Sequence, residues 1–178
     1  MSRSCRSSMR PTTGRTHLRR KAVKPILHIF LLFTSISLGA AADVSRHEQE
    51  DAIREAVFRY LFKHNAAIQL NAGTYCISLG DNDVDPPDEF MRRFDGHKPS
   101  VKKVSECHAD PFKGVVDKRT NQSGLIFRVR TISWISATEV KVTGGYFQDG
   151  LSASGNTYTL KKKQGKWKVT NNKMNWLS

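Results

Sequence analysis

A helical repeat of hydrophobic residues occupies residues 45–65, in the segment SRHEQEDAIREAVFRYLFKHN. Its apolar side chains recur at intervals of three and four residues, which places them on one side of a helix. They are Ile53, Ala56, Val57, Tyr60 and Leu61. Ser45 is expected to cap the first turn, with Glu48 three residues later in capping-box spacing. The segment therefore predicts an amphipathic helix that buries this stripe against the rest of the chain.

After Gly73 the pattern changes to β-branched and aromatic runs separated by turns, which is typical of strands. We predict strands over 74–79, 101–107, 114–119, 125–136, 138–148, 156–163 and 166–171. A short helix is expected over 85–94, with Asp85 as its N-cap and Pro86 in its first position. A helix followed by consecutive strands predicts an α+β domain, with the long N-terminal helix packed on an antiparallel sheet. Gly144-Gly145 inside a strand predicts a bulge or sharp bend, hence a curved sheet.

Residues 1–42 have the composition of a cleaved secretory signal peptide. Basic residues precede an apolar core over 25–38, and Ala40-Ala41-Ala42 supplies the small residues that signal peptidase requires. The core is short for a membrane-spanning helix. A buried helix and an organelle transit peptide are the alternatives, and translation from Met9 would shorten the basic flank. We expect residues 1–42 to be removed and residues 43–178 to form one mature domain.

The net charge of +13 over 178 residues is concentrated in the segment expected to be removed. Residues 1–42 hold eight of the 29 Lys and Arg and no Asp or Glu. Residues 43–178 therefore carry 21 basic and 16 acidic side chains, a net charge of +5. Such a charge is common among soluble domains and does not by itself indicate a nucleic-acid partner.

Cysteine usage agrees with export. Cys5 would leave with the signal peptide, so the mature chain keeps Cys76 and Cys107, an even number in an oxidising compartment. Neither cysteine belongs to a C-x-x-C pair, so zinc or thioredoxin-type chemistry has no supporting spacing. A disulfide between the two is the favoured interpretation, and two free buried thiols are the alternative.

The end of the chain carries the pattern Y-x-L-x-K-x-x-G-x-W-x-V, from Tyr158 to Val169. Together with the N-terminal helix and the run of strands, it resembles the cone-shaped α+β superfamily named for nuclear transport factor 2, also called SnoaL-like or cystatin-like. The resemblance covers residues 45–178 and is closest to small exported bacterial proteins with no assigned activity. Some members of the superfamily are isomerases, dehydratases or cyclases with a polar residue at the bottom of an apolar cone. No residue of this chain matches their catalytic motifs, so the resemblance implies a packing pattern and no catalytic residue.

Acidic residues at positions 81, 83 and 85 imitate the first three ligands of an EF-hand loop. The match then fails, because Pro86 stands where glycine is required and Arg92 where a bidentate glutamate is required. A solvated loop that caps the next helix is the simpler interpretation. We therefore expect no metal and no cofactor.

Five aromatic residues are expected to lie between the helix and the sheet: Tyr60, Trp134, Tyr146, Tyr158 and Trp167. Aromatic residues on facing strands usually fill the core. In a cone-shaped domain the same side chains can line a cavity for a small apolar ligand. The sequence leaves both interpretations open.

The segment TLKKKQGKWKV predicts a basic hairpin. Gln164-Gly165 fits a two-residue turn, which places Lys163 opposite Lys166 and Lys161 opposite Lys168 on one face. These lysines can simply keep an exposed sheet soluble and protect its edge. Alternatively they bind an anionic partner: phospholipid headgroups, an acidic polysaccharide or an acidic protein. Nucleic acid is less favoured, because stacking aromatic residues are not expected on that face.

These features together favour an exported binding or envelope-associated module without catalytic activity, secreted or periplasmic. A pocket enzyme of isomerase or dehydratase type and an inhibitor or immunity-type protein are the alternatives. A homodimer formed through the sheet is a further expectation, and no membrane anchor is expected after processing. A buried Asp or His with a shifted pKa at the cavity floor would favour the enzyme.

Overall fold

The computed structural model describes residues 34–65, 72–110 and 112–178, with side chains from residue 45 onward. The chain divides into two units, Met1–Gly39 and Ala40–Ser178, and the second contains the sheet. The helices are α1 (Thr34–His64) and α2 (Asp88–Met91). The strands are β1 (Thr74–Leu79), β2 (Ser100–Lys103), β3 (Cys107–Asp110), β4 (Gly114–Asp117), β5 (Gly124–Ser136), β6 (Glu139–Asp149), β7 (Ser152–Lys163) and β8 (Lys166–Leu177). The α+β class predicted from the sequence is confirmed.

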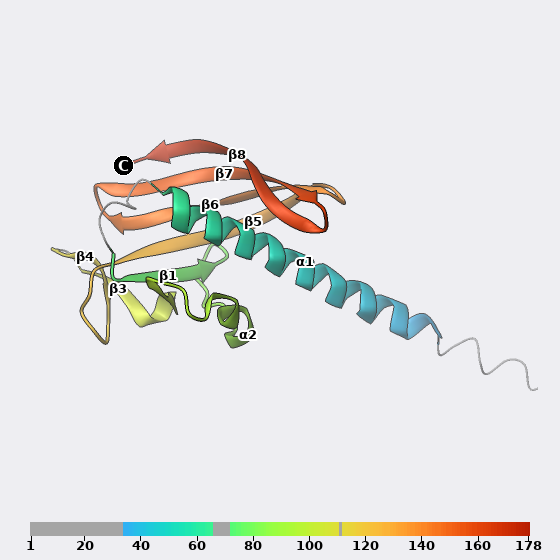
Figure 1. Cartoon of the computed structure of the whole chain (residues 1–178), viewed down its shortest axis with the longest axis horizontal. Coiled ribbons are helices and arrows are strands. Elements are labelled where there is room, and N and C mark those ends of the chain that lie inside the picture. The colour runs from blue at the N-terminus through green and yellow to red at the C-terminus, as the bar shows by residue number, and fades with distance from the viewer. Residues whose placement is uncertain (1–33, 66–71, 111) are drawn as a thin grey trace, which may run out of the picture. The chain divides into compact units, whose positions relative to one another are not determined.

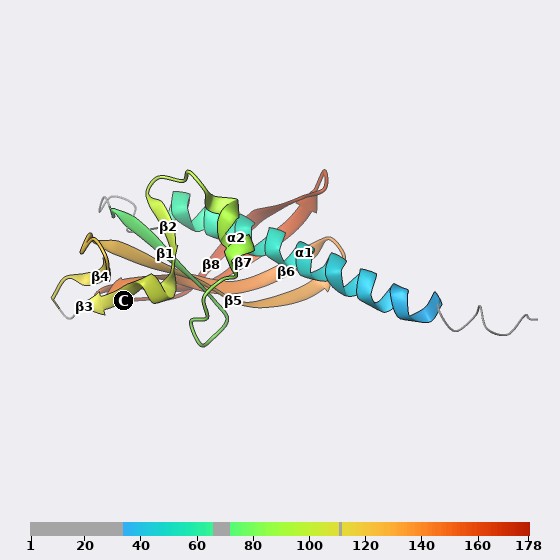
Figure 2. The same ribbon diagram turned by 90° about the horizontal axis from the view of Figure 1, so that it is seen from below.

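A six-stranded sheet in the order β2-β1-β5-β6-β7-β8 forms the centre of the second unit. The part of α1 that belongs to this unit lies across one face of the sheet, with α2 beside it (Figures 1 and 2). The expectation of an antiparallel sheet holds for β5 to β8 but is wrong for β1, which pairs parallel with both β2 and β5. The reason is that the segment containing α2 returns the chain to the end of the sheet at which β1 began. β2 therefore runs in the same direction as β1.

The main core lies between α1 and the sheet. Ile53, Val57 and Leu61 from the predicted stripe are buried, and Phe58 and Phe62 extend it. The Phe62 ring lies 5.0 Å from the Tyr75 ring and 5.2 Å from the Phe127 ring, measured between centroids. Aromatic contacts of this kind stabilise beyond their buried area, so α1 is held firmly against β1 and β5.

The predicted start of the first helix differs from the structure. In the full chain α1 begins at Thr34, so Ser45 lies inside the helix and does not cap it. The physical reason is the preceding run of alanines, which are the best helix formers and extend the helix upstream. The expected apolar core of the signal peptide falls mostly on residues 25–33, outside the described residues.

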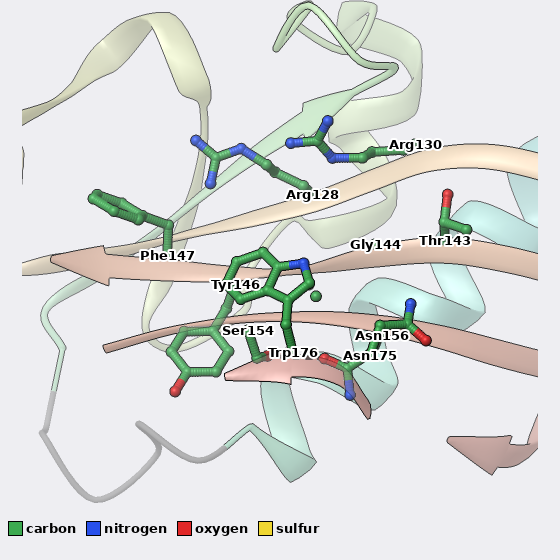
Figure 3. A pocket seen from close by; sticks show the side chains of 12 residues that line it. Arg128, Arg130, Thr143, Gly144, Tyr146, Phe147, Ser154, Asn156, Asn175 and Trp176 are labelled. Carbon is green, nitrogen blue, oxygen red and sulfur yellow. Dashed lines mark hydrogen bonds between the residues drawn. The ribbon is translucent and has the colours of Figure 1, made fainter. Parts of the chain in front are cut away.

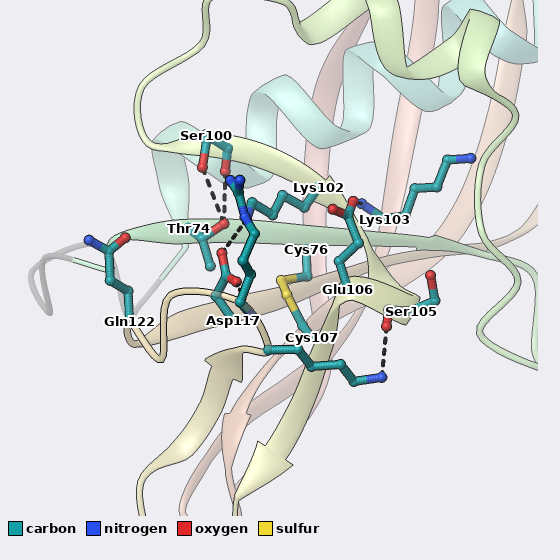
Figure 4. The surroundings of a disulfide bond; sticks show 12 residues. Thr74, Cys76, Ser100, Lys102, Lys103, Ser105, Glu106, Cys107, Asp117 and Gln122 are labelled. Carbon is teal, nitrogen blue, oxygen red and sulfur yellow. Dashed lines mark hydrogen bonds and ion pairs between the residues drawn. A yellow bond between two sulfur atoms is a disulfide. The ribbon is translucent and has the colours of Figure 1, made fainter.

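The opposite face of the sheet is covered at one end by the hairpin of β3 and β4. Cys107 of β3 forms a disulfide with Cys76 of β1, with their Cα atoms 6.5 Å apart, which confirms the predicted bridge (Figure 4). Val115 and Ile126 join the two cysteines in a second, smaller core. The disulfide therefore fixes the β3–β4 hairpin to the parallel edge of the sheet.

Three predictions for the segment 85–107 are wrong in detail. Asp85 does not cap α2; it accepts hydrogen bonds from the Ser105 backbone N–H at 2.9 Å and the Ser105 hydroxyl at 2.6 Å. Pro87 occupies the N-cap position, so Pro86 lies before the helix rather than in its first turn. The strand expected over 101–107 is split by a 3₁₀ turn over Val104–Glu106. That turn presents Ser105 to Asp85 and directs Cys107 to the disulfide.

Bulges interrupt the antiparallel part of the sheet. One lies in β5 opposite Gly144. Between Val129 and Ile132, β5 contains one residue more than the segment of β6 that pairs with it. This is beside the Gly144-Gly145 pair for which a bulge was predicted. A Cβ atom at Gly145 would lie 1.9 Å from the Ser154 carbonyl oxygen, so only glycine fits this close approach. Two further bulges lie in β8 and are described below.

Candidate functional site

A polar pocket lies on the helix-covered face of the sheet, where α1 ends over β6, β7 and β8. Its volume is about 160 Å³. The lining comprises Tyr60, Leu61, His64, Asn65, Tyr146, Ser154, Asn156, Tyr158, Asn172, Met174 and Leu177. An apolar cavity of about 150 Å³ holds a benzene molecule, so this pocket accommodates one small ring.

Three side chains form a hydrogen-bonded chain along the strand side of the pocket. The Ser154 hydroxyl donates to Asn156 Oδ1 at 2.8 Å, and Asn156 Nδ2 donates to Asn172 Oδ1 at 2.8 Å. Ser154 and Asn156 are buried, with 7% and 5% of their surface exposed. Burying polar side chains costs free energy unless they are paired, so this chain gives the pocket a polar wall with a fixed orientation.

Asn65 closes the helix side of the pocket. Its Nδ2 donates at 2.8 Å to the Leu61 carbonyl oxygen, which also accepts from the Asn65 backbone N–H at 3.1 Å. Its Oδ1 is buried and receives no hydrogen bond in the described part of the chain. An unpaired buried acceptor costs about 1–3 kcal/mol, so Asn65 carries an unsatisfied polar atom beside the pocket.

Two tyrosines connect the walls of the pocket. The Tyr60 ring lies 5.8 Å from the Tyr158 ring and 4.6 Å from the His64 ring. Burial, reinforced by the neighbouring Tyr60, raises the pKa of Tyr158 well above its usual value, so its phenol stays protonated. Among the described lining residues none is a carboxylate, lysine or arginine. The pocket is therefore lined by neutral donors and acceptors, with His64 at its exposed rim.

The five aromatic residues proposed as cavity candidates occupy two places. Tyr60, Tyr146 and Tyr158 line the pocket. Trp134 and Trp167 lie elsewhere, with their rings edge-to-face at 5.6 Å and the Arg46 guanidinium 5.3 Å from the Trp134 ring. The alternation of β7 and β8 turns Trp167 toward α1, but at the hairpin end of the sheet. These two tryptophans do not border the pocket.

The basic hairpin has the predicted register. Lys163 faces Lys166 and Lys161 faces Lys168 across a turn in which Gln164 and Gly165 both have positive φ. All four lysines are exposed, and Lys161 Nζ lies 3.4 Å from Glu139 Oε2 on β6. Lys162 belongs to the other face, where its Nζ donates to Gln49 Oε1 at 3.3 Å. The four predicted lysines therefore share the sheet face that α1 leaves uncovered.

The acidic loop between β1 and α2 uses its carboxylates in separate ion pairs. Asp83 accepts from Arg128 at 2.7 and 3.0 Å, and Asp81 lies 3.3 Å from Arg130. Partial burial opposes ionisation of Asp83, but the hydrogen bonds from Arg128 and Ser78 outweigh it and hold its pKa below the usual value. Among the described residues no group of three His, Cys, Asp or Glu could hold a metal ion.

Sequence reasoning missed the polar wall of the pocket. Ser154 and Asn156 lie on the same face of β7 as Tyr158, which was expected to face the helix. Extending the alternation from Tyr158 toward the start of β7 would therefore have found them. The orientation of Asn172 could not be predicted from such alternation. An extra residue at Thr170 shifts the register of β8, so that Asn172, and not Asn171, faces Tyr158.

Comparison with known proteins gives no relative from which a site could be transferred. No protein-family model, curated protein sequence or solved structure matches the chain significantly. Within the described residues, no helix has the length and apolar character needed to cross a membrane.

Proposed function

We propose that the protein is an exported binding module that holds a small neutral ligand in the pocket between α1 and strands β6–β8. The observation that carries this proposal is the fixed polar wall of Ser154, Asn156 and Asn172, which lines the pocket together with Asn65. Groups of complementary polarity converge on a space large enough for one ring, as in small-molecule sites generally.

The neutral lining selects the ligand class. A charged ligand would lose its hydration without meeting an opposite charge, which is costly in a buried site. A neutral ring with hydroxyl or amide groups can exchange hydrogen bonds with Asn172 and with the other neutral polar groups of the lining. Catalysis of isomerase or dehydratase type would need a general acid or base at the reacting atom. The pocket wall offers amides, a hydroxyl and a protonated phenol, and the one side chain of general-base type in the lining, His64, lies at the exposed rim.

A blocking variant tests the pocket. Met174→Trp places a large side chain at the rim, and Arg119→Trp adds the same side chain at an exposed position away from the pocket. Saturation-transfer NMR against neutral single-ring probes (uracil, nicotinamide and myo-inositol) should show binding to the parent and the Arg119 variant only. If Met174→Trp retains every signal, or no probe binds the parent, the pocket is not the binding site.

Export and family membership are separate parts of the proposal. We propose that residues 1–42 are a signal peptide and that residues 43–178 adopt the cone-shaped fold of the nuclear-transport-factor-2-like superfamily. A long helix followed by β hairpins supports the second part. N-terminal sequencing of exported protein should begin near Asp43, and a soluble cytosolic product that retains residues 1–42 would refute export. An experimental structure compared with that superfamily tests the fold.

A further inference from the structure

A second hollow lies on the face of the sheet that α1 leaves uncovered. It has a volume of about 330 Å³, and its lining includes Arg128, Arg130 and Trp176 (Figure 3). Its floor is crossed by Gly145 and Gly155, which pair across β6 and β7. Trp176 covers one side, with 55% of its surface exposed. A Cβ atom at Gly155 would lie 2.1 Å from Trp176 Nε1, so the indole rests directly on the glycine backbone. The glycines thus make a flat floor beside an exposed aromatic ring.

Trp176 reaches this face because of a bulge. The register of β8 shifts between its pairs with Asn156 and Gly155, so Asn175 is an extra residue and Trp176 faces Gly155. Without that extra residue, alternation from Met174 would turn Trp176 toward α1. The expectation that this face lacks a stacking aromatic residue is therefore wrong, because the bulge reverses the last part of the strand.

The hollow continues into the basic hairpin. Alternate residues of β7 from Gly155 to Lys163 lie on one face, a strip of roughly 27 Å. Cross-strand pairing adds residues of β6 and β8 to it. The strip carries six lysines: Lys141, Lys161, Lys163, Lys166, Lys168 and Lys173. On the described β6–β8 part of this strip, Glu139 is the single carboxylate. The strip is therefore strongly cationic.

Neutral hydrogen-bonding groups lie between these charges. Thr143, Thr157 and Thr159 occupy the same face of β6 and β7, and Asn171 faces Thr159 from β8. Arg128 contributes little charge, because Asp83 binds it through two hydrogen bonds. The surface thus combines separated positive charges, hydroxyl and amide groups, and one aromatic ring on a flat floor.

We infer that this face binds an acidic polysaccharide, with a sugar ring stacked on Trp176 and the acidic groups along the lysines. The C–H face of a pyranose ring is apolar and packs on an indole, while its hydroxyls need donors and acceptors of the kind that Thr and Asn provide. Single-stranded nucleic acid stacks successive bases on several aromatic side chains. Among the described residues that line this hollow, Trp176 is the one exposed aromatic ring, and Phe147 is half-buried. A lipid surface would not require a flat glycine floor.

The test separates charge from sugar recognition. Dextran sulfate, uncharged dextran and polyvinyl sulfate are titrated against the full chain, with tryptophan fluorescence and calorimetry as readouts. We expect dextran sulfate to bind tightest, to weaken steeply with salt, and to exceed polyvinyl sulfate at equal charge. Trp176→Ala should weaken dextran sulfate binding by about tenfold, comparable to the loss of one base–aromatic stacking contact, and leave polyvinyl sulfate binding unchanged. Trp176→Phe should recover part of that loss.

A charge-matched control identifies the face. Lys161, Lys163, Lys166 and Lys168 changed together to Gln should reduce dextran sulfate binding at least tenfold. The same change at Lys63, Lys98, Lys113 and Lys118, all exposed elsewhere, removes equal charge and should have little effect. Equal losses in both variants would overturn the inference, as would tighter binding of poly(dT) or of phosphatidylserine vesicles than of dextran sulfate. Gly155→Ala, which displaces the indole, should reproduce the Trp176→Ala result.

Discussion

The two edges of the main sheet are stabilised by different means. The β2–β1 edge has short parallel strands, and it is fixed by the Cys76–Cys107 disulfide and by the pair of Lys102 with the buried Asp117 (Figure 4). The β7–β8 edge has long antiparallel strands with two bulges and opposed lysines. Short parallel strands gain little from their own pairing, so tertiary cross-links supply the difference.

This contrast explains where the polar surfaces lie. At the β1–β2 edge, charged side chains form ion pairs that hold the structure together, as Lys102 does with Asp117. At the β7–β8 edge the ladder itself holds the strands, so side chains are free to form the polar pocket on one face and the basic strip on the other. Bulges at Thr170 and Asn175 also interrupt the regular hydrogen-bonding row of the exposed edge, which discourages pairing with other chains.

Removing the disulfide should give the largest loss. The bridge closes a segment with a sequence separation of 31, which corresponds to about 3–4 kcal/mol in the chain-entropy treatment. We expect the Cys76→Ala/Cys107→Ala variant to lose that much free energy of unfolding in urea denaturation. Reductant should lower the stability of the parent and leave the double variant unchanged. A loss below about 1 kcal/mol would mean that the β1–β2 edge does not depend on the bridge.

Asp117→Asn should cost about 3 kcal/mol at pH 7, because it leaves the mostly buried Lys102 ammonium without its counter-charge. Burial opposes ionisation of Asp117. The hydrogen bonds from Lys102 and from the N–H groups of Thr120 and Arg119 outweigh it, so the pKa of Asp117 lies well below its usual value. A lowered pKa contributes stability that is present above the ordinary carboxyl pKa of about 3.9 and is lost as pH falls below it.

The difference in stability between parent and Asp117→Asn should therefore be constant near neutrality and shrink below about pH 4. Lys102→Met/Asp117→Asn, which leaves no buried charge, should be more stable than Asp117→Asn alone. Denaturation curves measured from pH 7 to pH 2 give both results. A pH-independent difference would assign the loss to the turn at residues 117–120 and not to the ion pair.

Local signals in the sequence predicted much of this fold, but they did not predict which distant strands pair with one another. The stripe at Ile53 and Val57, the turn at Gln164-Gly165 and the two cysteines were each readable from neighbouring residues. The parallel pairing of β1 was not, because it depends on where α2 returns the chain. Asn172 and Trp176 were not predicted, because both lie beyond residue 171, where the last predicted strand ended. Each also follows a single-residue bulge in β8 that reverses the alternation.

The polar wall of the pocket should tolerate change better than the β1–β2 edge. Asn156→Ala removes the partner of both Ser154 and Asn172, and we expect a loss of about 1–2 kcal/mol. Water entering the pocket would satisfy part of that lost bonding. Thr159→Ala, on the other face of β7, serves as the control and should change stability by less than about 0.5 kcal/mol. A loss as large as that for the disulfide would contradict the proposed division between the edges.

The smallest expected effect is a gain at the hairpin. Lys163 and Lys166 lie directly opposite one another, and like charges in that arrangement destabilise a strand pair. Lys166→Glu should therefore raise the free energy of unfolding by up to about 1 kcal/mol, and the gain should shrink in 1 M salt. Lys168→Glu is the matched change opposite Lys161, which already has Glu139 at 3.4 Å. The repulsion there is partly relieved, so this second gain should be smaller. Equal gains would show that the variants act only through net charge, and a loss at position 166 would show that the opposed lysines cost the strand pair nothing.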